Sequence, residues 1–208
     1  MAPEEIESMF TRGTGEYAFA RWGRAIAPVV FGVEEETLSV VKGAFEAVCK
    51  LAGHHMEDVD PELGSNCMVF FLREWDELLD VPDLDRLVPG LAGLVDRLQG
   101  AGASQYRAFR FDETGAIKAA FVFLRMQGPL AEMPGEVLAL GQVVQIMLVW
   151  SDAAFASRSP LAVVGKTTIL RPDIADLLQA AYDPVLPAVA TDRAHSLRLF
   201  ARMKHEGE

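Results

Sequence analysis

Hydrophobic and polar residues follow two distinct patterns along this 208-residue chain. Apolar positions at steps of three and four residues, or long apolar runs, predict helices, whereas short β-branched and aromatic runs predict strands. The predicted helices span about 36–52, 91–98, 135–150, 172–181 and 191–203. The predicted strands span 26–33, 66–72, 106–111 and 117–125. The last two strands flank a short acidic turn that contains Gly115, and this arrangement predicts a β-hairpin.

Proline and glycine refine these boundaries. Pro28 lacks a backbone N–H, so the strand that contains it is predicted to lie at an edge of the sheet or to begin at this residue. Gly53 is expected to end the helix over 36–52. Pro172 is expected at the first position of the helix over 172–181.

The order of these elements predicts an α+β fold, in which a small mixed sheet carries helices packed on one face. We expect a single domain over residues 1–208. Within it, residues 1–16 are expected to form a loose lead-in, and residues 191–208 to contain the C-terminal helix.

Composition narrows the classes of protein to consider. Half of the residues are hydrophobic, which excludes a disordered chain. The formal net charge of −11 argues against a nucleic-acid partner, because an acidic surface repels phosphates. The apolar run Val137–Trp150 is too short for a membrane span, which needs about 20 residues. The first ten residues carry three glutamates and no basic start of an export signal, so we expect a cytoplasmic protein.

Two glutamines in the apolar helix over 135–150 mark a candidate site. Gln142 and Gln145 are three residues apart and therefore lie on one face of the helix. An unpaired buried amide costs about 1–3 kcal/mol, so each needs a partner. Either the two amides bond to a neighbouring strand, loop or water, or they line a cleft.

A second candidate is the pair His54-His55, which lies beside four acidic residues of the segment 57–62. Imidazole and carboxylate groups bind divalent cations. The alternative interpretation is a solvated connection between a helix and a strand.

The chain resembles the bacterial domain-of-unknown-function family numbered 2927. The resemblance rests on the segment from Gly141 to Asp152, which contains both glutamines, and on Ala181-Tyr182-Asp183-Pro184 downstream. The segments 20–22 and 64–71 are also similar to the first half of that family.

This resemblance implies a zincin-like fold, in which a central buried helix packs beneath a small mixed sheet. Zincins carry two histidine zinc ligands and a glutamate base on that helix. Here Gly141 and Gln145 stand at the ligand positions, and Gln142 stands at the position of the base. Glycine has no ligating side chain and an amide is no base at neutral pH, so we expect neither a metal cofactor nor metalloprotease activity.

The leading hypothesis is a non-catalytic zincin-like domain that acts through a protein partner or a small ligand. The alternative is a hydrolase-like enzyme with a non-standard site in the cleft beside the helix over 135–150. The candidate ligand-binding residues of that cleft are Gln142, Gln145, Asp152 and Tyr182. A homodimer is a third hypothesis, which rests on Trp22 and Trp75 as candidate exposed aromatic residues.

Overall fold

A four-stranded mixed sheet lies at the centre of the computed structural model, which describes residues 1–165 and 167–203. In spatial order the strands are β2 (Pro28–Phe31), β3 (Cys67–Leu72), β5 (Ile117–Arg125) and β4 (Gln105–Phe111). β2, β3 and β5 run parallel, and β4 pairs with β5 as an antiparallel hairpin. The predicted α+β class, the small mixed sheet and the hairpin are confirmed, and Pro28 does begin an edge strand.

Helices supply the crossover connections that parallel strands require. α2 (Glu35–Ala52) joins β2 to β3 and ends at Gly53, which has the left-handed φ of 66° that favours glycine. The chain between β3 and the hairpin contains η1 (Trp75–Asp80), α3 (Leu84–Leu87) and α4 (Leu91–Gly100). After β5, η2 (Gly128–Leu130) leads to α5 (Gly135–Met147).

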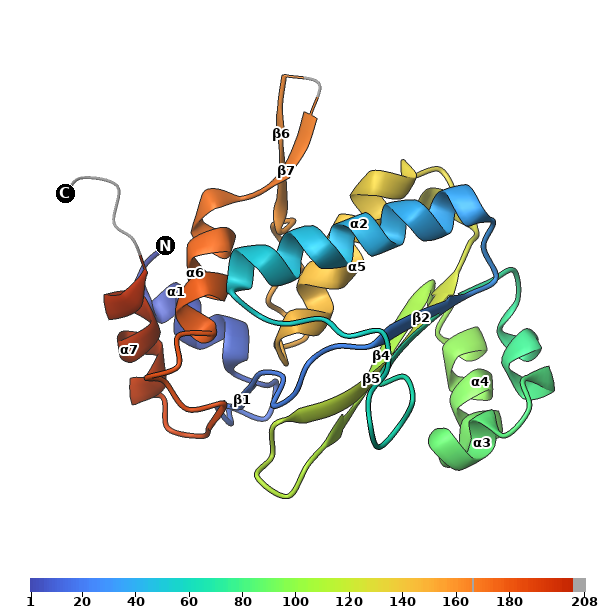
Figure 1. The fold of residues 1–208 in the computed structure, drawn as a ribbon, viewed down its shortest axis with the longest axis horizontal. Helices are drawn as coiled ribbons and strands as arrows, with labels where there is room; N and C mark the ends of the chain where they lie inside the picture. Colours follow the sequence, from blue (N-terminus) through green and yellow to red (C-terminus); the bar gives the residue numbers. More distant parts are fainter. Residues whose placement is uncertain (166, 204–208) are drawn as a thin grey trace.

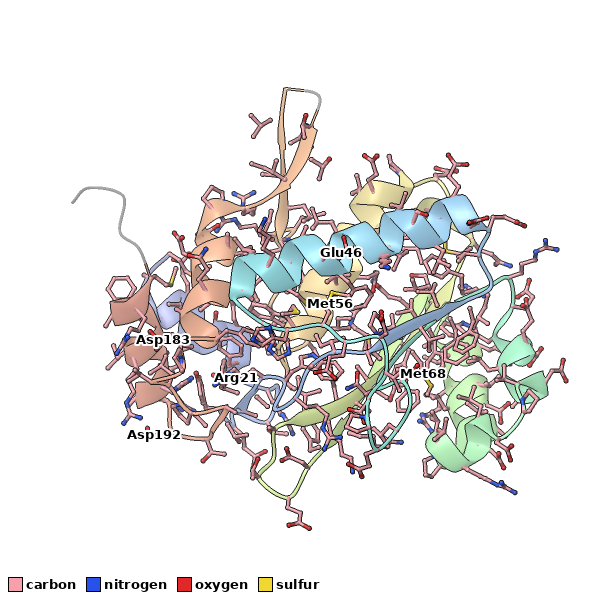
Figure 2. The ribbon with its side chains drawn as sticks, in the orientation of Figure 1. Arg21, Glu46, Met56, Met68, Asp183 and Asp192 are labelled. Atoms are coloured by element: carbon pink, nitrogen blue, oxygen red, sulfur yellow. The ribbon has the colours of Figure 1, made fainter. Side chains whose placement is uncertain are left out.

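Helices cover both faces of the sheet (Figure 1). α2 and α5 pack on one face, and η1, α3 and α4 pack on the other; in Figure 2, Met68 of β3 lies on the α4 side. Toward α5, β5 presents Ala120, Val122 and Leu124, and toward α4 it presents Ala119, Phe121 and Phe123. The prediction that helices pack on one face is wrong, because side chains alternate along a strand and β5 is apolar on both faces.

The two ends of the described chain pack together beside the sheet (Figure 1). β1 (Phe19–Ala20) pairs with β8 (Val189–Ala190), and α1 (Pro3–Phe10) contacts α7 (Ala194–Arg202). The predicted loose lead-in is wrong, because residues 3–10 form a helix that buries Ile6 and Phe10 completely. Of the predicted C-terminal segment, residues 204–208 lie outside the described residues.

Between α5 and α6 (Pro172–Ala181) a hairpin of β6 (Leu161–Val164) and β7 (Thr167–Leu170) projects from the body (Figure 1). The predicted helix over 172–181 is confirmed. Among the described residues, none of the helices has the length and apolarity that a bilayer crossing needs.

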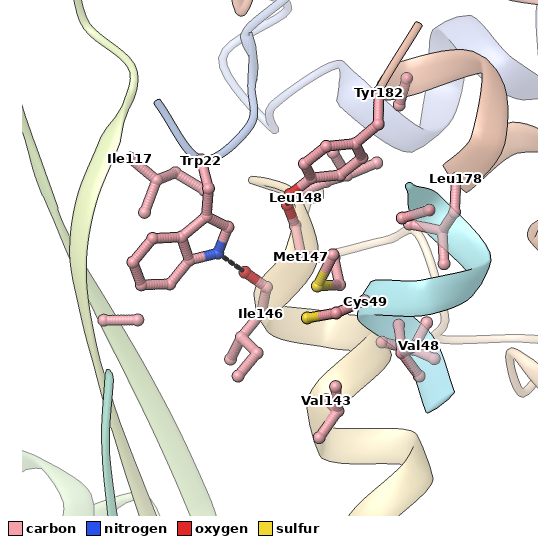
Figure 3. Packing of buried hydrophobic residues seen from close by; sticks show 14 of the residues in the cluster. Trp22, Val48, Cys49, Ile117, Val143, Ile146, Met147, Leu148, Leu178 and Tyr182 are labelled. Carbon is pink, nitrogen blue, oxygen red and sulfur yellow. Dashed lines mark hydrogen bonds between the residues drawn. The ribbon is translucent and has the colours of Figure 1, made fainter. Parts of the chain in front are cut away.

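The C-terminal end of α5 is capped by aromatic side chains. The last carbonyls of a helix have no partner within the helix. Here the Trp22 Nε1 donates to the Ile146 carbonyl at 2.8 Å, as Figure 3 shows, and the Tyr182 hydroxyl donates to the Met147 carbonyl at 2.7 Å. The Trp150 Nε1 donates to the Val144 carbonyl at 3.1 Å. These bonds fix the end of α5 at Met147, which precedes the predicted end at residue 150.

Both tryptophans that suggested an exposed dimer surface are core residues. Trp22 and Trp75 are each 0% exposed. Trp22 packs between Ile117 of β5 and the end of α5 (Figure 3), and Trp75 belongs to the cluster on the α4 face. The exposure that motivated the homodimer hypothesis is therefore absent at these two residues.

We expect replacement of Trp22 by alanine to lower the free energy of unfolding by about 3–5 kcal/mol, because it opens a cavity and leaves the Ile146 carbonyl unpaired. Trp22→Phe should lower it less, since the ring volume is partly kept. Urea unfolding measures both changes. Val185→Ala is the matched control, since Val185 is 70% exposed. A loss below about 1 kcal/mol for Trp22→Ala would contradict the proposed cap.

His195 of α7 is buried, and neither of its ring nitrogens has a hydrogen-bond partner among the residues that the structure describes. Its ring lies 4.4 Å from the ring of Phe19 and 6.3 Å from that of Tyr17. The pKa of His195 is lowered from 6.5 to about 4, chiefly by burial and in part by Arg198, while Asp192 opposes the shift. The neutral imidazole therefore belongs to the packed state of α7.

Acid is expected to weaken the fold through this histidine. The unfolded imidazole binds its proton near pH 6.5, whereas the folded one binds it only near pH 4. The contribution is thus complete above pH 6.5 and is lost as the pH falls to about 4, by an amount on the order of 3 kcal/mol. The loss of unfolding free energy over this range should be smaller in His195→Phe than in the native protein. The exposed His55 offers the control His55→Gln, and equal slopes in all three proteins would refute the assignment.

Candidate functional site

The two glutamines of α5 bind an arginine of the edge strand β4. The Arg107 Nη1 donates to the Gln142 Oε1 at 2.6 Å, and the Arg107 Nη2 donates to the Gln145 Oε1 at 2.5 Å. Gln105, two residues earlier on β4, accepts from the Arg107 Nη1 at 3.2 Å and from the Gln142 Nε2 at 2.9 Å. We call these four side chains the arginine–glutamine cluster.

Backbone geometry brings the four side chains together. Gln105 and Arg107 are two residues apart on β4, so both side chains point to the face on which α5 packs. Gln142 and Gln145 are one helical turn apart and point back toward β4. The cluster therefore joins α5 to β4, the edge strand of the sheet.

The positive charge of Arg107 lacks a counter-ion in the described part of the chain. Among the described residues, no carboxylate lies within 4.0 Å of its guanidinium, and its hydrogen bonds go to neutral amide oxygens. Burial lowers the pKa of Arg107 to about 10, so the side chain stays charged at neutral pH. A desolvated charge of this kind favours a bound anion.

A pocket of about 840 Å³ opens beside Arg107 and Gln145. Its other walls come from residues 12–14, which follow α1, and from residues 149–156, which follow α5. Trp150 and Phe155 supply aromatic surface, with ring centroids 4.8 Å apart. A smaller cavity of about 140 Å³ reaches Gln105, Gln142 and Gln145 from the side of β6. The cluster thus separates two openings.

The structure gathers three of the four predicted site residues. Gln142 and Gln145 belong to the cluster, and the exposed Asp152 lies on the wall of the larger pocket. Tyr182 lies elsewhere, because its hydroxyl caps α5 in the core, where burial raises its pKa. Of the two alternatives for the glutamines, both hold in part: they bond to a neighbouring strand and they border a pocket.

Sequence reasoning missed Arg107 and Gln105. A signal existed, because two polar residues at alternate positions of an apolar strand mark one face of that strand. Their pairing with α5 was not visible in the sequence, since Arg107 lies 35 and 38 residues from its two glutamine partners.

In the segment that begins at His54-His55, the side chains of His54, Asp60 and Glu62 already bond to other groups of the protein. The His54 Nε2 lies 3.0 Å from the Arg24 carbonyl, and burial lowers the pKa of His54 to about 4. Asp60 accepts from the Asn66 side chain and from two backbone amides, and Glu62 pairs with Arg24 and Lys118. In the described part of the chain, no three His, Cys, Asp or Glu side chains are grouped as metal ligands.

The zinc ion that a zincin-like fold implies does not fit the residues on α5. Gly141 has no ligating side chain, and the oxygens of Gln142 and Gln145 already face the guanidinium of Arg107. A divalent cation would have to displace that guanidinium against its positive charge. The chemistry of the cluster is instead that of a fixed cation held by amides.

We expect a double-mutant cycle to show that Gln142 stabilises the fold mainly through its hydrogen bond with Arg107. Gln142→Leu should lower the free energy of unfolding by about 1–3 kcal/mol, because a buried charged donor loses its acceptor. In an Arg107→Met background the same substitution should cost less than about 0.5 kcal/mol. Chemical denaturation of the four proteins gives the coupling.

The matched control is Gln99→Leu, which removes an exposed glutamine bonded to Asp76 on the opposite face of the sheet. Its effect should be the same with Arg107 and with methionine at that position. Additive effects of Gln142→Leu and Arg107→Met would contradict the coupling.

No family model, no curated protein and no solved structure matches this chain.

Proposed function

We propose that the protein is a non-catalytic domain that binds a small anionic ligand in the pocket beside Arg107. The observation that carries this proposal is a desolvated guanidinium whose partners are all neutral amides. Carboxylate and phosphate groups match the planar donors of arginine and would compensate its charge.

The charge of the pocket supports an anionic ligand. Of the described residues that line it, Arg12 and Arg107 are cationic and Asp152 alone carries a carboxylate. The chain as a whole carries a formal net charge of −11. A locally positive pocket in such a protein attracts anions that the remaining surface repels.

Size and wall chemistry indicate what the anion is attached to. The volume of about 840 Å³ is within the usual range of small-molecule sites. Trp150 and Phe155 provide apolar faces on which a planar group can pack. We therefore propose a ligand that joins a carboxylate or phosphate to an aromatic or other flat apolar group.

Binding is favoured over the hydrolase alternative by the groups that the pocket holds. Tyr182 was one of the candidate residues of the enzyme site, and its hydroxyl is bonded to the Met147 carbonyl instead. Amides cannot act as general bases at neutral pH. We also propose that the domain is zincin-like, that it is cytoplasmic and that it has no nucleic-acid partner.

Phenyl phosphate, inorganic phosphate and benzyl alcohol are suitable probes, with binding followed by calorimetry and by chemical shifts of the Trp150 indole. Phenyl phosphate should bind most tightly, because it alone offers both an anion and a ring. Arg107→Met should weaken its binding at least tenfold, by about 1.4 kcal/mol or more.

Arg97→Met provides the matched control, since Arg97 is an exposed residue of α4 bonded to its own helix. It should leave binding of phenyl phosphate unchanged. If none of the probes binds, or if Arg107→Met and Arg97→Met behave alike, the anion site is refuted.

A further inference from the structure

We propose that the outer edge of β2, with the groove beside it, binds an extended basic segment of a partner protein as an added strand. This surface lies at the opposite edge of the sheet from β4 and Arg107. It is therefore separate from the anion pocket, and each can be tested without the other.

The backbone of β2 offers unpaired groups along this edge. The Cys67 amide donates to the Ala27 carbonyl at 3.3 Å, which fixes the alternation of the parallel ladder. Residues 27, 29 and 31 therefore face β3, whereas Pro28 and Val30 turn their backbone groups outward. By this alternation the Pro28 carbonyl and both polar backbone groups of Val30 point away from β3, and among the described residues no loop, turn or side chain bonds to them.

The protein already pairs the start of this edge with its own chain. The Ile26 amide donates to the His55 carbonyl at 3.1 Å, and the Glu57 amide donates to the Ile26 carbonyl at 3.0 Å. The segment then turns away from the sheet, and Val59 is 63% exposed. The next two positions of the edge stay open, so an incoming strand would continue a pairing that the loop begins.

A groove of about 660 Å³ lies between this edge and α2. Phe45 forms part of its floor, and Leu38 and Met56 contribute apolar walls. Figure 2 shows Glu46 on α2 and Met56 on the loop near this groove. An added strand would direct every second side chain into the groove, so small apolar residues are expected at alternate positions.

The rim of the groove determines the charge of the partner. Glu46, Glu57 and Asp58 line it, against the single cation Lys42. None of these three carboxylates forms an ion pair within the described part of the chain. A second copy of this acidic chain would bring like charges together, whereas a segment with flanking lysines or arginines would compensate them.

A suitable probe is the acetylated and amidated nonapeptide Lys-Lys-Val-Thr-Val-Thr-Val-Lys-Lys, compared with the peptide in which every lysine is replaced by glutamate. We expect the basic peptide to shift the backbone amide resonance of Val30 and to slow its hydrogen exchange. The acidic peptide should bind at least tenfold more weakly. A peptide methylated on alternate backbone nitrogens should lose binding, because it cannot complete a ladder.

The charged rim is tested with Glu46→Lys/Glu57→Lys, which should weaken binding of the basic peptide at least tenfold at low salt. Glu113→Lys, on the exposed β4–β5 turn, is the control and should have no such effect. Leu38→Ser tests the apolar wall without a change of charge, at a position that is 42% exposed, and should weaken binding of the basic peptide.

Equal binding of the two peptides, no perturbation at Val30, or an unchanged affinity in the rim variant would overturn the proposal. Concentration-dependent dimerisation that slows hydrogen exchange at Val30 without any peptide would also overturn it, because a second copy would then occupy the edge. Binding of phenyl phosphate at Arg107 should be the same with and without the peptide.

Discussion

The fold depends on how the C-terminal end of α5 is closed inside the protein. Its final turn lies in the core, where a carbonyl without a partner costs about 1–3 kcal/mol. Trp22, Trp150 and Tyr182 satisfy three of these carbonyls from different parts of the chain. The same bonds tie the N-terminal segment and α6 to the central helix. Tyr182 is therefore a structural residue, although its position near the glutamine helix in sequence suggested a ligand site.

The side of α5 that faces β4 is polar. α5 is apolar on nearly all sides, but the side that faces β4 carries Gln142 and Gln145. Arg107 bonds to both amides, so the helix is positioned against the edge strand by charge-assisted hydrogen bonds. An arginine in this place serves packing, because its amide partners fix its direction, and under the proposed function its uncompensated charge serves binding as well. The cluster holds no carboxylate, and a carboxylate there would have closed the site with an internal ion pair.

Local sequence patterns predicted most of the elements but not the contacts between them. The strands, the hairpin and the helices α2, α4, α5 and α6 follow from periodicity, glycine and proline, which act over a few residues. The helix α1 was missed because eight residues give too few turns to reveal a buried face. The second helical layer was missed although β5 is apolar at every position from 119 to 124, which indicates burial on both faces. Arg107 was missed because its partners are remote in sequence, and only packing of α5 across the sheet unites them.

The two edge strands of the sheet, β4 and β2, differ in the charge of the residues around them. β4 is an antiparallel edge whose polar side chains bind α5, so its surface is defined by a positive charge. β2 is a short parallel edge that begins with a proline, and among the described residues the loop pairs only with Ile26, two residues before it. Short edges and prolines protect a sheet from unspecific pairing, and the acidic residues around β2 exclude further copies of this acidic chain. Under the proposed interaction, the same features admit a basic strand. One set of residues would then both limit aggregation and select the partner.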